Sequence, residues 1–421
     1  MLSQKVSGTS AGLWLLVPEF QRLGVWDLLK GWTKGGDMDF GPRIALQAVN
    51  ESALCTNRVR KKNSLGHQGF QLANGMGRLV TDEQVHLLLN GHTMEDAQDL
   101  LVNLGRQRQL SGHYRGDIVA IDPHRIISSS QRVMAKKKKV PDAPSEKMLQ
   151  TFFAVSAETG QPVMATMSST GMPTTRATKN LLTATEKIIR TDSLLVADKE
   201  HFTRELLTEV KNNPRFDILT PALSTQRINT LVKGLNYTRL WAGFAIAETP
   251  FCFEGSHEAF RLIAQRCGEK EGQYSYKTFV TTSDRQASEL VAGDYDKRWS
   301  VEEFFNFENK MDLNRASTQN LNIRYGKLAL AMVAQAATYQ LRTKLKEEYR
   351  TWNAGHLAAE VLAWADGDIR VQDDTIIVTF YQAPAHLNPN DYTNLPKILQ
   401  RENIDPRIPW LYNFKLDFRF K

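Results

Sequence analysis

The spacing of apolar residues along the chain predicts helices in its first part and strands further on. Up to about residue 110, apolar positions recur every three or four residues in short segments separated by glycine clusters, as in a set of packed helices. Beyond this point, apolar residues stand in consecutive runs at Ile118–Ile121, Thr151–Val155 and Val163–Met167. Such runs, the last preceded by a Gly-Gln-Pro turn, are typical of strands. We therefore expect an antiparallel meander to begin a sheet here.

The next segments alternate between helical and strand patterns. Thr175–Arg190 and His201–Val210 have the spacing of amphipathic helices, whereas Leu194–Ala197 and Phe216–Leu219 have the pattern of strands. Alternation of this kind brings the carboxyl ends of strands to one edge of a sheet, where sites in open α/β sheets usually lie. The pattern predicts an α/β fold with its chemistry at that edge.

Later in the chain the pattern changes twice. Residues 222–285 are rich in strand-forming and aromatic residues, including Trp241, and residues 323–349 are apolar at helical spacing. Residues 351–421 contain one helical and one strand pattern but no chemical motif.

A helix predicted over Tyr295–Lys310 carries both charged residues and apolar anchors. Successive residues of an α-helix turn by about 100°, which places four polar residues on one face: Tyr295, Arg298, Glu302 and Asn309. Four apolar residues supply the side that faces a core: Val301, Phe304, Phe305 and Phe307. A carboxylate such as Glu302, held beside an arginine on a buried helix, is either half of a structural ion pair or a metal ligand.

Two aspartates directly follow strand patterns. Asp122 closes the run Ile118–Ile121, and Asp198 closes the run Leu194–Ala197. With Glu302 they form a set of oxygen ligands, the type that Mg²⁺ and Mn²⁺ prefer.

Each of these aspartates has a rival nearby. Asp117 would face the opposite side of the strand from Asp122, and it opens the apolar run rather than closing it. Asp192 precedes its strand, where a turn or capping role is usual. We therefore choose Asp122 and Asp198. The neighbouring His124 either assists in activating water or holding a phosphate, or is an ordinary loop histidine, which is the commoner case.

The composition indicates a type of partner and a cellular compartment. The 421 residues include 53 Lys and Arg against 46 Asp and Glu, and this net charge of +7 favours a polyanionic partner such as nucleic acid, although proteins without one also carry it. The three cysteines form no Cys-x-x-Cys pair, which argues against a zinc site or a disulfide framework and fits a reducing compartment. The apolar stretches Leu13–Val17 and Leu328–Ala337 are too short for a signal segment or a membrane span. We expect a cytoplasmic protein.

Taken together, these residues resemble the catalytic domain of the DDE transposases of the IS4 superfamily. In that family two strands end in aspartates, and a helix carries the signature Tyr-x-x-Arg-(x)3-Glu-(x)6-Lys. Tyr295, Arg298 and Glu302 match this spacing, whereas Asn309 occupies the lysine position and Lys310 follows it. Lys310 either reaches the same place with its long side chain or has lost that role. The resemblance covers roughly residues 112–345.

The resemblance implies an α/β fold: an RNase H-like mixed sheet flanked by helices, with a β-rich insertion and a helical N-terminal domain. In chain order, it implies a helical DNA-binding domain, the first part of the RNase H-like domain, the insertion, the segment with the catalytic helix, and a region without an assigned role. These are residues 1–110, 111–221, 222–285, 286–350 and 351–421.

The resemblance also implies phosphoryl transfer with two metal ions. Asp122, Asp198 and Glu302 would hold two Mg²⁺ ions, with Mn²⁺ as a substitute. The protein would cut DNA at the ends of an insertion sequence and join the 3′-hydroxyls to target DNA. Its partners would be the terminal inverted repeats, the target DNA and a second copy of the chain in a synaptic dimer at the nucleoid, with no membrane.

Two other functions stay open. The first is a catalytically silent DNA-binding protein of transposase descent, which the shifted Lys310 alone supports. The second is a stand-alone nuclease, which would cut DNA but never join ends.

Further positions are candidates for DNA contact. Four consecutive lysines, Lys136, Lys137, Lys138 and Lys139, cannot all face a core, so they form either a solubilising hairpin tip or, as we favour, a phosphate-binding element. Trp241 either packs in the core, the commoner case for tryptophan, or is exposed and stacks on an unpaired base. The basic residues within 58–62 are equally consistent with a solvated loop and with DNA contact.

Overall fold

The computed structural model describes residues 5–8, 10–56, 68–128, 133–138, 144–169, 171–313, 318, 320–363 and 365–421. The basic patch within residues 58–62 therefore lies outside the described residues. The chain forms two compact units: Gly112–Phe304 is one, and Met1–Ser111 together with Phe305–Lys421 is the other.

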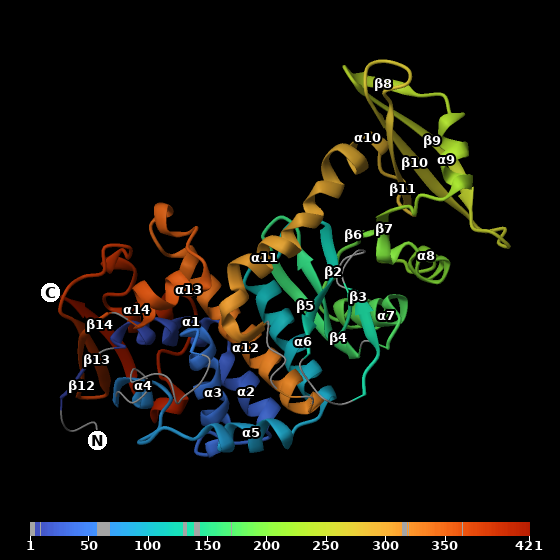
Figure 1. Ribbon diagram of the computed structural model, residues 1–421. Helices are drawn as coiled ribbons and strands as arrows, with labels where there is room; N and C mark the ends of the chain where they lie inside the picture. Colours follow the sequence, from blue (N-terminus) through green and yellow to red (C-terminus); the bar gives the residue numbers. More distant parts are fainter. Residues whose placement is uncertain are drawn as a thin grey trace. The chain divides into compact units, whose positions relative to one another are not determined.

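A mixed β-sheet forms the centre of the unit Gly112–Phe304 (Figure 1). Its main strands are β2 (Ile118–Ile127), β4 (Ser145–Ser156), β5 (Gln161–Ser169), β6 (Ser193–Ala197) and β7 (Phe216–Pro221). The first three form the expected antiparallel meander, and β6 and β7 continue the sheet parallel to β2. The resulting order β5-β4-β2-β6-β7 is that of an RNase H-like sheet, so the predicted fold class is confirmed.

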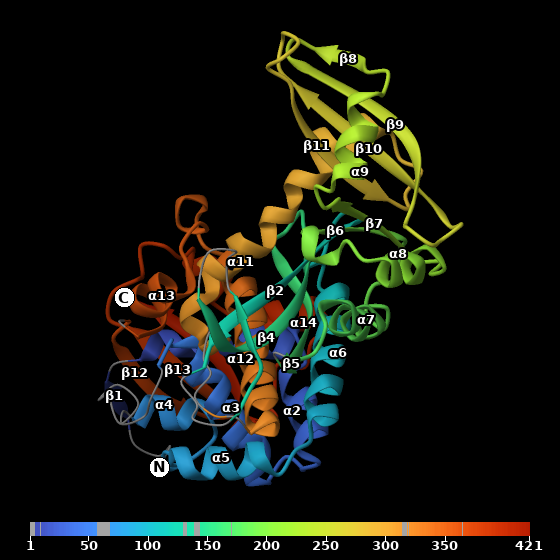
Figure 2. The same cartoon turned by 45° about the vertical axis from the view of Figure 1, so that its right-hand side comes forward.

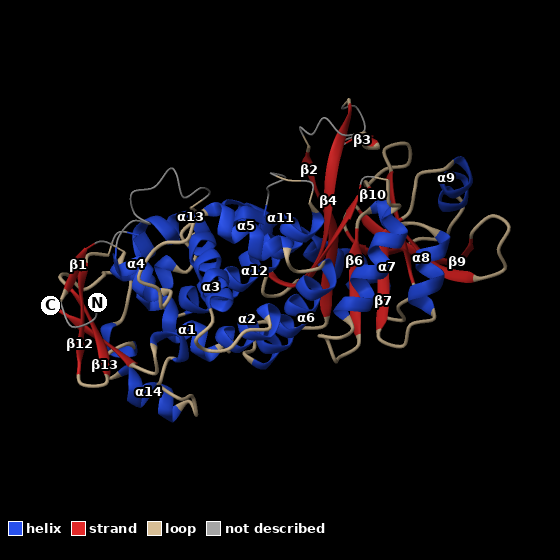
Figure 3. Ribbon diagram, turned by 90° about the horizontal axis from the view of Figure 1, so that it is seen from below, coloured by secondary structure: helices blue, strands red, loops and turns tan. Residues whose placement is uncertain are grey.

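Two helices pack against one face of this sheet. The helix α7 (Thr174–Thr185) contacts β4 and β5, and α8 (Arg204–Lys211) contacts β7 and α7 (Figure 3). The hydroxyl of Thr203 accepts the N–H of Leu206 and so begins α8. Every residue of β6 is buried, as is typical of a parallel strand in the middle of a sheet.

The chain after β7 extends the same sheet. The helix α9 (Gln226–Lys233) precedes a second antiparallel meander (Figure 2), formed by β8 (Thr238–Trp241), β9 (Phe244–Cys252), β10 (Ala259–Cys267) and β11 (Ser275–Thr281). Because β11 pairs with β7, this block within 222–285 continues the central sheet. Its outer strand, β8, is exposed at all four positions.

The segment that carries Glu302 changes its type of helix along its length. It is a π-helix over Leu290–Asp294, a 3₁₀-helix over Tyr295–Trp299, the α-helix α11 over Ser300–Glu308, and a π-helix again over Asn309–Leu313. The single α-helix predicted over Tyr295–Lys310 is therefore wrong at both ends. Residue spacing reports apolar periodicity but not the switch between i+3, i+4 and i+5 hydrogen bonds.

The other unit consists mainly of helices. They include α1 (Val17–Arg22), α2 (Val25–Thr33), α3 (Phe40–Ala53), α4 (Gln68–Ala73), α5 (Asp82–Asn90), α6 (Met94–Leu110), α12 (Leu321–Thr343), α13 (Ala354–Leu357) and α14 (Leu395–Arg401). Capping boxes begin α5 and α6, where the hydroxyls of Thr81 and Thr93 accept a backbone N–H two residues into each helix. No helix in the described ranges is both long and apolar enough to span a membrane.

The two ends of the chain fold together in this unit. The strand β1 (Val6–Gly8) pairs with β12 (Gly367–Gln372), which continues through β13 (Thr375–Phe380) to β14 (Lys415–Phe420). Arg43, only 2% exposed, donates to the main-chain oxygens of Gly75 and Trp410. The last part of the chain is thus an integral part of the fold that the first hundred or so residues begin.

Candidate active site

Asp122 and Asp198 lie beside each other on neighbouring strands. The parallel register of β2 and β6 pairs Ile121 with Ala197, so the next residues on the two strands are Asp122 and Asp198. Neighbouring strands are about 4.8 Å apart, and side chains at paired positions point to the same face. The sheet therefore brings the two predicted aspartates together.

The candidate site lies where β6 ends and β2 continues. The sequence predicted that the strand would end at Asp122, but β2 continues to Ile127, paired with β4 on its other edge. In the described part of the chain no strand pairs with the β6-facing edge of β2 beyond Ile121. Pro123, which has no N–H to donate, fits at this point. Asp122 therefore lies where β2 no longer has β6 as a neighbour.

Arg298 connects Glu302 to this pair. Its Nη2 lies 3.2 Å from Oε1 of Glu302, one α-helical turn along the chain, and its Nη1 lies 4.0 Å from Oδ2 of Asp122. The anchor of α11 explains how Glu302 is held here: Val301 is fully buried, and the ring of Phe304 lies 5.7 Å from that of Phe153 on β4. The side chains of Arg298, Asp122 and Glu302 are 12%, 19% and 40% exposed, so the cluster borders on solvent.

The two aspartates have different electrostatic environments. Burial, followed by repulsion from the Asp198 carboxylate, raises the pKa of Asp122 to about 7. Burial acts in the same direction on Asp198, but the hydrogen bond and electrostatic attraction of His201, the Glu200 N–H and Arg298 outweigh it and lower the pKa of Asp198. The Asp198 carboxyl group is thus stabilised as an anion, whereas the charged form of Asp122 is destabilised.

Tyr295 lies beside the same cluster. Its ring packs edge-on against Phe279 of β11, with ring centres 4.8 Å apart. Burial raises its pKa, and Arg298 acts in the opposite direction. The three matched signature residues Tyr295, Arg298 and Glu302 therefore all interact electrostatically with Asp122.

The rival aspartates lie elsewhere. Asp117 forms an ion pair with Arg285 at 2.6 Å and is 56% exposed at the start of β2. Asp192 is exposed in the turn before β6. His124 is half-buried and, two residues along β2, lies on the same face of the sheet as Asp122.

Sequence reasoning missed the residues that hold Asp198. His201 Nδ1 lies 3.0 Å from Asp198 Oδ1, and the hydroxyl of Thr220 donates to the main-chain oxygen of Asp198 at 2.8 Å. The helical spacing predicts that His201 begins a helix, but Lys199–His201 form a 3₁₀ turn that Asp198 caps. The short spacing between Asp198 and His201 was the only signal in the sequence.

Lys310 belongs to the other compact unit. It is exposed in the π-helical turn Asn309–Leu313, and its side chain lies against Gly355, where a Cβ atom would approach its Cδ to 2.5 Å. Its place leaves both alternatives for its role open.

The candidate DNA-contact residues are partly described. Lys136 and Lys138 are exposed on β3 (Lys136–Lys138), which pairs with the start of β4. Lys139 and the side chain of Lys137 lie outside the described residues. Trp241 is 52% exposed and stacks on Phe244 with ring centres 4.2 Å apart, so it is not a core tryptophan.

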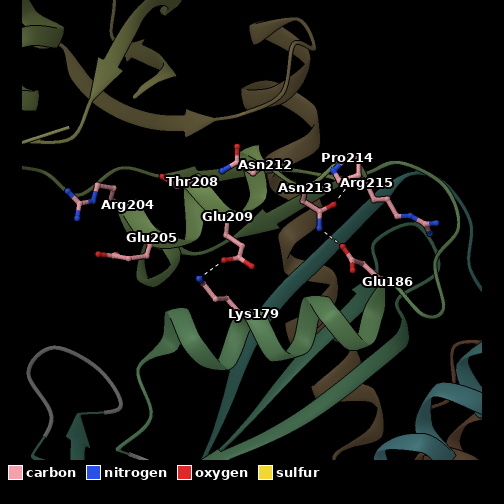
Figure 4. A pocket seen from close by; sticks show the side chains of 10 residues that line it. All are labelled: Lys179, Glu186, Arg204, Glu205, Thr208, Glu209, Asn212, Asn213, Pro214 and Arg215. Carbon is pink, nitrogen blue, oxygen red and sulfur yellow. Dashed lines mark hydrogen bonds and ion pairs between the residues drawn. The ribbon is translucent and has the colours of Figure 1, made fainter. Parts of the chain in front are cut away.

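A groove of about 720 Å³ runs between α7 and α8 (Figure 4). Two of its carboxylates have partners within the groove: Glu209 forms an ion pair with Lys179, and Glu186 accepts a hydrogen bond from the side-chain amide of Asn213. It contains none of the predicted site residues. The sheet edge with Asp122 and Asp198 is the better candidate for chemistry because it places two carboxyl groups side by side and raises the pKa of Asp122 to about 7.

The donor set of the cluster is that of a hard divalent cation. In the described part of the chain Asp122 accepts no hydrogen bond, and its buried charge is opposed by that of Asp198. A cation would relieve both effects. Within the same described ranges, no three His, Cys, Asp or Glu side chains converge as they do around a bound metal, and Glu302 contacts Arg298 instead.

Comparisons with known proteins identify a family for the chain. A family model described as "Transposase DDE domain" matches residues 113–335, which is more than half of the chain. No curated protein matches the chain. Among solved structures, the chain is similar to the piggyBac transposase in a synaptic complex with hairpin DNA, with 13% identity, 86% of this chain and 82% of that chain covered, and a TM-score of 0.48.

Proposed function

This chain belongs to the family of transposases with a DDE domain, and we propose that it is the transposase of an insertion sequence of the IS4 type. In this proposal it cuts DNA at the ends of the element and joins the 3′-hydroxyls to target DNA. The observation that carries the proposal is the pairing of Asp122 and Asp198 where β6 ends, with Arg298 linking Asp122 to Glu302.

Asp122, Asp198 and Glu302 are the proposed ligands of two divalent cations, Mg²⁺ or its substitute Mn²⁺. When bound, such cations supply Lewis acidity at the attacking and leaving oxygens of a phosphodiester. The raised pKa of Asp122 supports this role. It shows that the Asp122 carboxylate is destabilised by burial and by repulsion from Asp198, and a bound cation would offset both effects.

Arg298 has a positioning role in this proposal. It lies 4.0 Å from Asp122 and 3.2 Å from Glu302, so it connects two of the three carboxylates. Its planar guanidinium contacts the two through different nitrogens, which a lysine ammonium does not reproduce. Tyr295 packs against Phe279 and interacts with Arg298.

DNA is the proposed partner, in the form of the terminal inverted repeats and the target, with a second copy of the chain in a synaptic dimer. Exposed Lys136 and Lys138 supply charge for phosphates. Exposed Trp241, already stacked on Phe244, offers a platform for an unpaired base.

The proposal is tested by cleavage of a supercoiled plasmid that carries the coding segment with its flanking DNA, in the presence of Mg²⁺. Asp198→Asn should reduce cleavage by on the order of 1000-fold, since it removes several kcal/mol of transition-state stabilisation. Asp192→Asn, an exposed aspartate just before the same strand, is the matched control and should retain activity. Equal activity of Asp198→Asn and the control would refute the site.

The catalytically silent alternative is favoured by one observation, the displacement of the signature lysine to Lys310, which packs on Gly355. In that case the wild-type chain binds the same DNA but leaves the plasmid intact at every Mg²⁺ concentration. Joined products distinguish a transposase from a nuclease, because a nuclease yields cut ends only.

A further inference from the structure

We propose that His201 is a positioning residue that fixes the Asp198 carboxylate in the orientation needed to bind a cation. This inference rests on the proposed function, in which Asp198 is a ligand. It assigns a role to a buried histidine that is not part of the family signature.

The hydrogen bonds to Asp198 fall on one oxygen. The Oδ1 atom accepts the Glu200 N–H at 2.9 Å and lies 3.0 Å from His201 Nδ1. In the described part of the chain, the other oxygen, Oδ2, accepts no hydrogen bond from the protein. Two donors on one side of a carboxylate fix its rotation and leave the second oxygen free for a ligand.

His201 has no access to DNA or bulk water. Its side chain is 0% exposed, and within the described ranges its Nε2 has no hydrogen-bond partner. Because an ionised carboxylate only accepts hydrogen bonds, the ring carries a hydrogen on Nδ1 and donates it. The ring thus acts through Asp198 and does not itself touch the reacting atoms.

The turn that holds His201 is tied to the sheet from two sides. Thr220 on β7 donates to the main-chain oxygen of Asp198 at 2.8 Å. Arg125 on β2 forms an ion pair with Glu200 and donates to Gln150 on β4 at 3.3 Å. The strands β2 and β7, on either side of β6, therefore hold the 3₁₀ turn. This fixes the position of the His201 imidazole.

Asp122 provides the contrast. No hydrogen-bond donor holds its carboxyl group in the described part of the chain, and its nearest cationic group, on Arg298, lies at 4.0 Å. The site thus pairs one pre-oriented ligand, Asp198, with one that is free to adjust. Pre-orientation of this kind is what outer-shell partners of metal ligands contribute, typically 10-fold to 100-fold in metal affinity.

A purely structural histidine predicts something different. If the His201–Asp198 contact only stabilises the cap of the 3₁₀ turn, its loss lowers the melting temperature but leaves cation affinity unchanged. Affinity for Mn²⁺ alone, measured without DNA or turnover, therefore separates the two roles.

The experiment measures Mn²⁺ binding to the full chain by electron paramagnetic resonance of the free ion. His201→Leu fills the buried space without a donor and should weaken Mn²⁺ binding by at least about 10-fold. His201→Asn is the matched control, because its side-chain amide nitrogen occupies nearly the same position as Nδ1, and it should stay within about 3-fold of wild type. Should His201→Leu fail to fold, His201→Gln takes its place, since its amide lies too far along the side chain to replace the Nδ1 donor.

The outcomes distinguish this inference from the proposed function. Unchanged Mn²⁺ affinity in His201→Leu, with affinity lost in Asp198→Asn, overturns the positioning role alone. Unchanged affinity in Asp198→Asn overturns the ligand assignment as well, and with it the proposed mechanism. Weakened binding in His201→Leu that His201→Asn restores supports the inference.

Discussion

Replacing Asp122 with asparagine should stabilise the metal-free protein, although it removes a proposed ligand. Burial and the neighbouring Asp198 carboxylate raise the pKa of Asp122 from 3.8 to about 7 in the folded state. Asparagine has nearly the same shape but no charge, so it removes both the cost of burying a charge and the repulsion from Asp198. A residue retained despite such a cost is expected at a functional site.

The magnitude follows from linkage. The folded pKa lies above the unfolded value, so the folded state binds the proton more tightly, and stability is lost as pH rises from about 4 to about 7. Each pKa unit corresponds to about 1.4 kcal/mol, which gives a cost of roughly 4 kcal/mol above pH 7. Asp122→Asn should recover this free energy at pH 8, a rise in melting temperature of roughly 5 °C. The gain should shrink by about 1.4 kcal/mol for each pH unit below 7 and vanish near pH 4.

The assay is thermal unfolding in EDTA between pH 4 and pH 8, with Asp192→Asn as the control. The control residue is exposed, so its substitution should change stability by less than about 0.5 kcal/mol at any pH. Added Mg²⁺ should raise the melting temperature of the wild type at pH 8 more than that of Asp122→Asn. If Asp122→Asn melts at or below the wild-type temperature at pH 8 in EDTA, the electrostatic account of the site is wrong.

Three further predictions concern DNA contact and the fold. Replacing Lys136 and Lys138 with alanine should weaken DNA binding and lower the slope of log affinity against log salt by about 2; an unchanged slope in a filter-binding titration would remove these lysines from the interface. Trp241→Ala should leave the melting temperature almost unchanged, because the ring is 52% exposed, yet weaken binding to a DNA end with unpaired bases by roughly 10-fold, and equal loss on blunt duplex would exclude stacking. Arg43→Met should destabilise the protein by at least about 3 kcal/mol in urea unfolding, because it leaves buried carbonyl oxygens without a donor, and a loss below about 1 kcal/mol would show that water replaces the guanidinium.

The sequence by itself determined the type of fold and most of the candidate cluster. Apolar runs of strand length alternate with helical spacing because burial on one face imposes a period, and this period is local. The same local pattern gave the positions of Asp122 and Asp198, since parallel strands end at a common edge. The spacing of Tyr295, Arg298 and Glu302 gave the third carboxylate through the family resemblance.

Only the tertiary structure decided which of these groups meet and in what state. The register of β2 against β6 makes Asp122 and Asp198 neighbours, and β6 ends there whereas β2 continues to Ile127. The pKa of Asp122 depends on burial and on a carboxylate from a distant part of the chain. No periodicity reports such contacts, because they depend on how elements pack and not on the spacing of residues within one element.

The same reason explains what the sequence left out. The helical spacing predicts that His201 begins a helix, yet it hydrogen-bonds to Asp198 because strands on both sides of β6 hold its turn. Arg43 belongs to no motif in the sequence, yet it donates to a carbonyl oxygen of Trp410, far along the chain. Local sequence patterns fix which faces are buried, whereas long-range packing chooses the partners of each buried polar group. The chemistry of this protein depends on those partners.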